Sequence, residues 1–364
     1  MSEINISHIK WMKRAIFLAS LGKNSTSPNP RVGAVILDKK GKLISEGFHF
    51  RPGMPHAEAM AFNNLKKDPK DGSIYVNLEP CCHQGKTPPC VDKIISSGIR
   101  NVYISIQDPD KRVSGRGIKL LQEAGIQVHL GLCKKESLEL NKDFFHRNIT
   151  NKSFGVLKWA MSLDGRVGLK NGKSKWISNE KSRSLVHSLR AEFDAIIIGG
   201  NTLRKDNPLL TTRGSKAPEP LRVVFTKTLD LPAKSNLWNC NEAKTLVLYD
   251  SSTANEEFLA RIPKCVEVDK VSGDNPELIS KLLAERGCNK VLWECGPKLA
   301  TAAIKSGCIN EVISFIAPKI LGGDSNMNPF GDFEFQEMHE TIKLRQVDVS
   351  FLGDDICVKS SLKK

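Results

Sequence analysis

The first 150 residues alternate between two spacings of apolar side chains. Apolar residues at the helical period, beginning with Ile9 and Met12, predict a helix over 8–21. The unbroken apolar run 32–37 predicts a buried strand. The same interpretation gives strands at 43–46, 74–78, 102–106 and 126–130, helices at 56–65, 91–97 and 117–124, and a charged helical stretch at 131–152. Strands and helices that alternate in this way predict an α/β sandwich.

The alternation restarts at Phe154, after the charged helical stretch. The expected elements are strands at 154–161, 195–198, 221–225, 245–249, 291–294, 311–317 and 355–360, and helices at 179–190, 275–286 and 297–306. A second α/β domain therefore follows the first. We place the boundary near 147–153, which gives domains of residues 1–150 and 151–364.

Composition narrows the class of protein. The 364 residues are 40% hydrophobic and 26% charged, which is enough to bury a core and excludes disordered or fibrous chains. No apolar run approaches the roughly 20 residues of a membrane span, and the short run 15–19 is unlike a secretion signal. The 10 cysteines are too sparse for a disulfide scaffold. We expect a cytoplasmic protein that does not contact a membrane.

The net charge of +14 has three interpretations. It is typical of a solvated basic surface, of nucleic-acid binding, or of binding to small phosphorylated ligands. No long block of Lys and Arg occurs, and aromatic residues make up only 6% of the chain, so nucleic acid is disfavoured. Charge alone does not choose between the other two.

The most informative side chains are those of a possible zinc site. His56, Cys81 and Cys90 offer three ligands of a tetrahedral zinc, and a fourth position left to water is typical of a catalytic site. Zinc lowers the pKa of such a water to about 7, and a carboxylate nearby moves its proton to a leaving group. Glu58 and His56 face one ion only from the first turn of a helix, where Pro55 places them.

Two neighbouring residues leave an alternative open. Cys82 directly follows Cys81, and adjacent side chains on a tight turn diverge, so we expect Cys82 to be a neighbour of the metal rather than a ligand. A helix beginning near Cys90 would favour its thiolate. A purely structural zinc would instead need a fourth protein ligand, which Cys82 or His83 would supply.

The spacing of these residues resembles the zinc deaminase signature H-x-E…P-C-x-x-C, with six extra residues between the cysteines. This longer form, with His83 and Lys86 inside it, resembles the deaminase domain of the bifunctional riboflavin-biosynthesis deaminase/reductase family. The resemblance implies a cytidine-deaminase-like α/β/α sandwich with one zinc ion per chain. It assigns the ligands and the catalytic residue to His56, Cys81, Cys90 and Glu58.

Further matches extend this resemblance through the first domain. Pro28-Asn29-Pro30 precedes the first strand, and Gln107-Asp108-Pro109 opens a loop that closes the family's site. The resemblance assigns substrate contacts to Asn29, His49, His83, Lys86 and Asp108. The stretch 110–112 is more charged than in the family, so no contact is carried over to position 110.

The second domain resembles the reductase domain of the same family, which has a dihydrofolate-reductase-like fold. It holds no G-x-G-x-x-G, so a Rossmann domain is not indicated. The resemblance assigns substrate contacts to Lys158, Ser174, Arg190, Leu210, Arg213 and Glu294, the two arginines being phosphate ligands. It assigns cofactor contacts to Ala160, Trp176, Thr202, Asp206, Thr226 and Gly296. Gly296-Pro297 begins a helix whose free N–H groups suit a pyrophosphate.

The resemblance implies two successive steps of riboflavin biosynthesis. The first is hydrolytic deamination of 2,5-diamino-6-ribosylamino-4(3H)-pyrimidinone 5′-phosphate. The second is reduction of the ribosyl side chain by NADPH, giving 5-amino-6-ribitylaminouracil 5′-phosphate. Thr226 and Lys227, after a strand, would meet the 2′-phosphate of NADPH. We expect small phosphorylated pyrimidines as substrates, no nucleic-acid partner, and a homo-oligomer.

Two alternatives belong to other classes of protein. A nucleic-acid base deaminase fused to an RNA-binding domain would need an extended basic and aromatic platform, for which the second domain holds no recognisable motif. A non-enzymatic protein with a structural zinc would need the fourth protein ligand described above.

Overall fold

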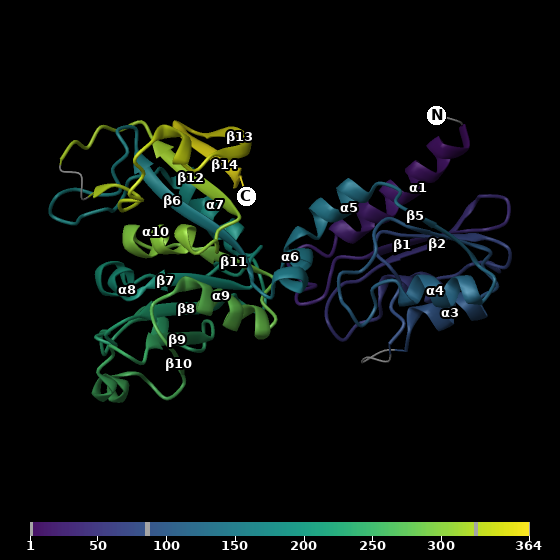
Figure 1. Ribbon diagram of the computed structural model, residues 1–364, viewed down its shortest axis with the longest axis horizontal. Coiled ribbons are helices and arrows are strands. Elements are labelled where there is room, and N and C mark those ends of the chain that lie inside the picture. The colour runs from purple at the N-terminus through teal and green to yellow at the C-terminus, as the bar shows by residue number, and fades with distance from the viewer. Residues whose placement is uncertain (1–2, 84–87, 324–326, 364) are drawn as a thin grey trace. The chain divides into compact units, whose positions relative to one another are not determined.

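The computed structural model describes residues 3–83, 88–323 and 327–363 of the chain, which forms two compact units, Met1–Thr150 and Asn151–Lys364 (Figure 1). Each unit contains its own sheet. Within the described residues, no helix has both the length and the apolar character that crossing a membrane requires. The mixed α/β class predicted from the sequence is confirmed for both units.

The first unit is built on a five-stranded sheet with the order β2-β1-β3-β4-β5. The interior strand β1 runs antiparallel to β2 and β3, whereas β3, β4 and β5 are parallel. The strands are β1 (Gly33–Leu37), β2 (Leu43–Phe48), β3 (Ser73–Val76), β4 (Asn101–Ile104) and β5 (Gln127–Leu130). The helices are α1 (Glu3–Ser20), α2 (Ala57–Asn63), α3 (Cys90–Ser96), α4 (Arg116–Glu123), α5 (Lys134–Leu140) and α6 (Lys142–Thr150).

Helices cover both faces of this sheet because its interior strand β1 is apolar on both sides. Along β1, Ala34 and Ile36 pack with α2, α3 and α4, while Val35 and Leu37 face the other way and pack with α1. Side chains alternate between the two faces of a strand, so an unbroken apolar run such as β1 must be buried on both. Figure 1 shows α1 and α5 on one side of the sheet and α3 and α4 on the other.

The second unit contains a nine-stranded sheet with the order β10-β9-β8-β7-β11-β6-β12-β14-β13. Pairings from β10 through β12 are parallel, and β14 and β13 are antiparallel. The strands are β6 (Phe154–Ser162), β7 (Ala195–Gly199), β8 (Leu221–Thr226), β9 (Thr245–Asp250), β10 (Glu267–Val271), β11 (Lys290–Trp293), β12 (Glu311–Ala317), β13 (Leu344–Leu352) and β14 (Asp355–Leu362). The helices are α7 (Glu180–Arg190), α8 (Gly200–Asp206), α9 (Pro276–Glu285) and α10 (Pro297–Lys305), with 3-10 helices η1 (Asn236–Trp238), η2 (Glu256–Arg261) and η4 (Met338–Glu340).

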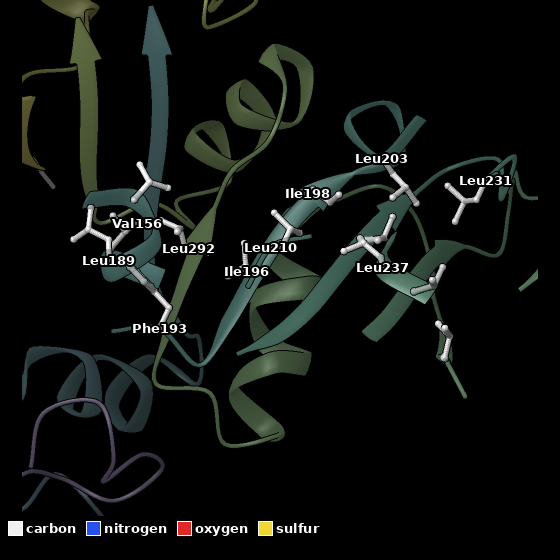
Figure 2. Packing of buried hydrophobic residues seen from close by; sticks show 14 of the residues in the cluster. Val156, Leu189, Phe193, Ile196, Ile198, Leu203, Leu210, Leu231, Leu237 and Leu292 are labelled. Carbon is white, nitrogen blue, oxygen red and sulfur yellow. The ribbon is translucent and has the colours of Figure 1, made fainter. Parts of the chain in front are cut away.

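Two cores lie on the two faces of this larger sheet. Ile196 and Ile198 of β7 belong to the core that α7 and α8 cover, and Figure 2 shows them among the neighbouring side chains. Ala195 and Ile197 belong to the core under α9 and α10. The carboxyl ends of the parallel strands thus meet along one edge of the sheet, where ligands bind in open α/β folds.

Three regular elements differ from the sequence-based prediction. The sequence analysis gave no helix at α8 and no strands at β10 and β13. Residues Gly199 and Gly200 lowered the helical signal of α8, since glycine disfavours helices. In β13, eight of nine residues are exposed, so the buried periodicity that marks a strand is missing there.

Candidate active sites

Three side chains of the first unit converge on one point. His56 Nδ1 lies 3.4 Å from Cys81 Sγ and 3.5 Å from Cys90 Sγ. The ligand atoms of the three residues all lie within 4.8 Å of one another. One nitrogen and two sulfur atoms form a donor set that suits zinc, and three protein ligands leave one position of a tetrahedral ion open.

The first turn of α2 positions both His56 and the nearby carboxylate. His56 is the N-cap residue of α2, and Glu58 is in the first turn. The helix packs close to β2 at Gly47, where an added Cβ would lie 2.5 Å from Ala61 N and 2.7 Å from Ala57 O. Only glycine allows this approach, so the Gly47 position helps to determine where the α2 residues lie.

The two cysteines are linked through the start of α3. Cys90 is the first residue of α3, and its backbone N–H donates to Cys81 Sγ at 3.4 Å. The hydrogen bond from the Cys90 thiol lowers the pKa of Cys81, and this same bond together with burial raises the pKa of Cys90. The helix N-terminus adds positive potential at both sulfurs, which favours metal-binding thiolates.

Glu58 is a buried carboxyl group beside these ligands, with 3% of its surface exposed. Burial, and next the negative charge of Cys81, raise its pKa to about 7, while the His56 ring acts in the opposite direction. A carboxyl group with a pKa near neutrality can both accept and release a proton.

Asn29 and His49 form a second polar pair near the metal ligands. Asn29 Nδ2 lies 3.0 Å from His49 Nε2, and His49 Nδ1 lies 3.1 Å from the carbonyl oxygen of Pro55. These partners assign the ring proton to Nδ1, because only a protonated nitrogen can donate to a carbonyl. Burial lowers the pKa of His49, which keeps the ring neutral. The rings of His49 and His56 meet edge to face, with centroids 5.5 Å apart.

Glu79, whose role the sequence analysis did not address, holds the loop that carries Asp108. The Glu79 carboxylate is 3% exposed and accepts backbone N–H bonds from Asp108 (3.2 Å), Gly115 (2.9 Å) and Ile118 (3.2 Å). Burial raises the pKa of Asp108 to about 7. One feature of the sequence could have identified Glu79 as a site residue. It is an acidic residue directly before Pro80-Cys81, at the end of a buried strand.

The other predicted residues of this site differ in their surroundings. His83 Nδ1 is buried and, among the described residues, lacks a hydrogen-bond partner, so it is available to a ligand. Asp110 forms an ion pair with Arg112 at 2.5 Å, and Cys82 donates to the Arg112 carbonyl at 3.8 Å. Cys82 therefore lies outside the group of three ligands. Lys86 lies outside the described residues.

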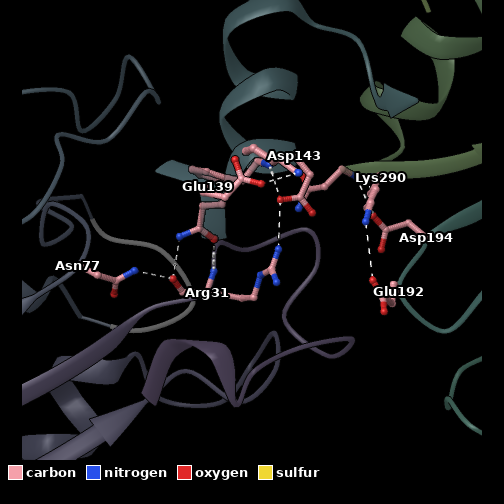
Figure 3. A network of polar contacts seen from close by, with 11 residues as sticks. Arg31, Asn77, Glu139, Asp143, Glu192, Asp194 and Lys290 are labelled. Atoms are coloured by element: carbon pink, nitrogen blue, oxygen red, sulfur yellow. Dashed lines mark hydrogen bonds and ion pairs between the residues drawn. The ribbon is translucent and has the colours of Figure 1, made fainter. Parts of the chain in front are cut away.

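Two buried amides anchor the segment that carries Asn29. Asn141 and Asn77 both donate to the carbonyl of Arg31, at 2.9 Å and 3.0 Å, and the Arg31 side chain reaches Asp143 at 3.4 Å (Figure 3). Neither amide was among the predicted residues. Only the fold brings them together, because Asn141 lies 110 positions after Arg31 in the sequence.

In the second unit, three charged residues meet beyond the carboxyl end of β11. Arg190 binds Glu294 in a bidentate manner, with Nε–Oε1 at 2.7 Å and Nη2–Oε2 at 3.1 Å. Lys158 Nζ lies 3.9 Å from Glu294 Oε2. Burial alone would raise the pKa of Glu294, but the charges of Arg190 and Lys158 lower it to about 2. Burial also lowers the pKa of Lys158.

The loop after α8 brings further groups to this cluster. Arg190 Nη1 donates to the carbonyl oxygen of Thr211 at 3.2 Å. Burial lowers the pKa of His187, and the positive charges of Arg190 and Arg213 lower it further. Glu219 shapes the loop, since it accepts bonds from the N–H and the hydroxyl of Thr212, both at 2.7 Å. The structure thus brings Lys158, Arg190, Arg213 and Glu294 into one region.

Leu210 is a different case from these charged residues. Its side chain is 2% exposed and belongs to the core cluster drawn in Figure 2, so only its backbone is available to a ligand. Ser174 is half-buried in the loop before α7.

The predicted cofactor residues follow several strands at the same edge of the sheet. Trp176 is 63% exposed, which excludes a core role, and Arg183 lies over its ring at 4.5 Å. The neighbouring Lys175 donates to the carbonyl of Asp206 at 3.1 Å, which links the loop before α7 to the end of α8. Thr202 is half-buried in α8, and Ala160 is half-buried in β6.

Two glycines at this edge have opposite surroundings, because one is tightly packed and the other is open. Gly200 begins α8 and packs on Thr226, since an added Cβ would lie 3.1 Å from Thr226 Oγ1. Gly296 is the N-cap of α10, and an added Cβ would meet nothing within 4 Å. Lys227, which follows Thr226, forms an exposed ion pair with Asp274.

Comparison with known proteins identifies the family of this chain. Residues 153–358 match the family model for the RibD C-terminal domain, and residues 6–106 match that for the cytidine and deoxycytidylate deaminase zinc-binding region. Riboflavin biosynthesis protein RibD of Synechocystis sp. is 40% identical over 351 residues, covering 96% of this chain and 95% of that protein. The chain belongs to the RibD family. It is therefore a bifunctional deaminase and reductase of riboflavin biosynthesis, and its deaminase domain is a zinc-binding one.

Solved RibD structures have the same fold. Acinetobacter baumannii RibD aligns with a TM-score of 0.88 at 32% identity, over 99% of this chain and 100% of that chain. The diaminohydroxyphosphoribosylaminopyrimidine deaminase/5-amino-6-(5-phosphoribosylamino)uracil reductase of Thermotoga maritima aligns with a TM-score of 0.85 at 33% identity, over 99% and 100%. A RibD reductase domain implies a nicotinamide cofactor for this chain.

Proposed function

We propose that the unit Met1–Thr150 deaminates 2,5-diamino-6-ribosylamino-4(3H)-pyrimidinone 5′-phosphate, with His56, Cys81 and Cys90 as the ligands of one zinc ion. The observation that carries this proposal is the convergence of the three ligand atoms within 4.8 Å, directly beside the buried Glu58. A zinc ion held there would act as a Lewis acid that activates water.

Glu58 is the proton carrier of this reaction. Its pKa of about 7 lets the carboxylate accept a proton from the attacking water and pass it to the departing amine. Because Glu58 lies at the start of α2 beside His56, no rearrangement of the backbone is needed to bring it to the reacting atoms.

The remaining deaminase residues recognise the substrate. Asn29, with its amide oriented by the neutral His49, offers hydrogen bonds to the pyrimidine. His83 Nδ1, buried and unpartnered among the described residues, and Asp108 offer further polar contacts. We assign Lys86 to the ribose phosphate from the family resemblance, since it lies outside the described residues.

In the second unit, we propose reduction of the ribosyl side chain to 5-amino-6-ribitylaminouracil 5′-phosphate. The nicotinamide cofactor supplies the hydride, and the protein supplies position and charge. Lys158 and Glu294 face the reacting sugar, and Arg213 binds the substrate phosphate, with Ser174 and the Leu210 backbone as further contacts. The Arg190 guanidinium donates two hydrogen bonds to Glu294. While that pair is intact, Arg190 attracts the substrate phosphate only through its positive charge at a distance.

We assign NADPH as the cofactor of this unit. Trp176 is exposed beside the site, and Gly296 leaves the start of α10 open to a pyrophosphate. The remaining contacts are proposed for Ala160, Thr202, Asp206 and Thr226. Lys227 would exchange its partner Asp274 for the 2′-phosphate, which explains a preference over NADH.

A coupled assay tests both activities on the full chain. With zinc and the diaminopyrimidinone substrate alone, ammonia should appear without NADPH. NADPH added afterwards should be oxidised, and the amount oxidised should equal the amount of deaminated compound already formed. Oxidation of NADPH with the first substrate while no ammonia is released would contradict the proposed order.

The chain is further proposed to be a homo-oligomer that acts on small molecules and binds no nucleic acid. Val349 and Phe351, which share a face of the edge strand β13, are 54% and 74% exposed. Such an apolar edge favours pairing with a second copy. Sedimentation velocity of the full chain should give more than one copy per particle, and F351E should shift the distribution toward monomers.

A further inference from the structure

The loop between α8 and β8 has an uncommon backbone. Asn207, Leu210 and Arg213 have φ angles of 41°, 54° and 54°, which lie in the left-handed region. Asparagine adopts this region readily, whereas leucine and arginine rarely do. Such conformations persist only where the surrounding structure holds them. The contacts that hold Leu210 and Arg213 therefore bear on the substrate contacts proposed for these two residues.

The first half of the loop is fixed by burial. The Leu210 side chain belongs to the core, and Thr212 has no exposed surface. Between them, the carbonyl of Thr211 accepts a hydrogen bond from Arg190 at 3.2 Å. Residues 210–212 thus form a fixed base, and the next residue, Arg213, is exposed.

One carboxylate holds the turn that carries Arg213. Glu219 accepts hydrogen bonds from the backbone N–H of Thr212 at 2.7 Å and from that of Gly214 at 3.4 Å. These are the residues directly before and after Arg213. The Thr212 hydroxyl also donates to this carboxylate, at 2.7 Å, and accepts from the backbone N–H of Lys216 at 3.2 Å. Glu219 therefore fixes the backbone on both sides of Arg213.

We propose that Glu219 is a positioning residue for the substrate phosphate, because it holds Arg213 in the left-handed conformation from which the guanidinium binds that phosphate. This inference rests on the proposed role of Arg213 as a phosphate ligand. The backbone conformation at a residue decides where its side chain begins, so a turn without its carboxylate lets the guanidinium sample other positions. A turn that is already fixed lowers the entropy that is lost when the phosphate binds.

The negative charge of Glu219 makes the direction of the effect decisive. A carboxylate near a phosphate repels it, so a role through charge alone predicts tighter binding when the carboxylate is removed. A positioning role predicts weaker binding, because Arg213 is then no longer held in place. The two roles therefore change the KM in opposite directions.

The test measures NADPH oxidation by the zinc-loaded full chain with the deaminated substrate. E219A should raise the KM for this substrate about fivefold, the loss expected for one hydrogen bond, and change kcat by less than about twofold. E219Q keeps one oxygen that can accept from Thr212, so its KM should lie between those of E219A and the original chain. An unchanged or lower KM in E219A would overturn the proposal.

Glu267 provides the matched control. It begins β10, at the amino end of that strand, and forms an ion pair with Arg286 at 2.6 Å. E267A removes a carboxylate from the same unit but from the other edge of the sheet, so it should leave the KM unchanged. An equal rise of the KM in E267A and E219A would overturn the proposal, because any lost carboxylate would then have the same effect.

A double substitution shows whether Glu219 acts through Arg213. The KM of R213A/E219A should equal that of R213A within about twofold, because no guanidinium is left to position. Independent effects would multiply and would overturn the proposal. An unchanged KM in R213A alone would remove the proposed phosphate contact and this inference with it. A raised KM in R213A together with an unchanged KM in E219A would overturn this inference alone.

Proteolysis gives a readout that needs neither substrate nor cofactor. Trypsin cleaves after arginine where the backbone can open locally, so E219A should be cut after Arg213 about threefold faster or more than the original chain and E267A. Fragment masses identify the cut, and the rates at other sites should not change. Equal rates after Arg213 in E219A and the original chain would overturn the proposal. Faster cleavage at every site would also overturn it, because Glu219 would then support the whole unit rather than this turn.

Discussion

Each of the two units buries one glutamate at its proposed active site, and the two glutamates have opposite surroundings. Glu58 is buried beside thiol sulfur atoms, and burial, followed by the negative charge of Cys81, raises its pKa to about 7. Glu294 lies against Arg190 and Lys158, which lowers its pKa to about 2. Burial raises the pKa of both groups, and only around Glu294 do the neighbouring charges outweigh burial.

The difference shows what each carboxyl group can do. A group that titrates near neutrality can move a proton during a reaction, which suits the release of ammonia. A group that stays ionised throughout can only orient cations and hydroxyl groups, which suits the positioning of a sugar for hydride transfer. Four substitutions test this contrast.

The largest effect is expected where the metal itself is lost. C90S should lower the zinc content and abolish ammonia release, because a serine hydroxyl does not replace a thiolate ligand. Zinc analysis and an ammonia assay measure this. C82S is the matched control and should keep both zinc and activity. Loss of zinc in C82S instead would show that the proposed ligands are wrong.

Glu58 is expected to be essential for proton transfer but not for metal binding. E58Q should keep its zinc and lose roughly 10² or more in the rate of ammonia release, because an amide keeps the shape and cannot carry a proton. NADPH oxidation with the deaminated substrate should not change. Normal turnover in E58Q would remove the contrast between the two glutamates.

Glu294 is expected to matter for stability as well as for reduction. E294Q leaves Arg190 and Lys158 without their counter-charge, which should lower the free energy of unfolding of the second unit by about 3 kcal/mol at pH 7. Four of the 5 tryptophans lie in that unit, so fluorescence during urea unfolding reports on it. Ammonia release should not change.

The pH dependence sharpens this prediction. The pKa of Glu294 falls from an ordinary 4.5 to about 2 on folding, so its stabilising contribution is complete above pH 4.5. It is lost as the pH falls through the range from about 5 to 2. The gap in unfolding free energy between E294Q and the original chain should narrow in this range, and a constant gap would contradict the ion pair.

The smallest effect is expected at the phosphate contact. R213A should raise the KM for the deaminated substrate about tenfold, because it removes one charge-assisted hydrogen bond. Ammonia release is the internal control and should be unaffected. A chain in which R213A slows deamination would contradict the separation of the two sites.

The fold was largely predictable because both central sheets consist of apolar runs such as 32–37 and 195–198, separated by amphipathic helices. His56, Glu58, Cys81 and Cys90 stand in a spacing that already implies a chemistry. The supporting contacts were not predictable. Glu79 and Asn141 look like ordinary polar residues until the fold brings their backbone partners to them.

The bond between Arg190 and Glu294 was likewise hidden in the sequence. The two residues are 104 positions apart, and each was assigned to the substrate separately. A pattern gives the residue type at a site, whereas the pairing of charges depends on which strands are neighbours. The exposed strand β13 was missed for a related reason, because its residues lack a buried face.

The separate cores of the two units have a genetic consequence. Each core cluster draws its buried residues from one unit alone. A substitution that unfolds one core is therefore expected to leave the core of the other unit folded. Two alleles damaged in different halves should complement each other in one cell, because each supplies the enzyme step that the other lacks and the intermediate diffuses between them.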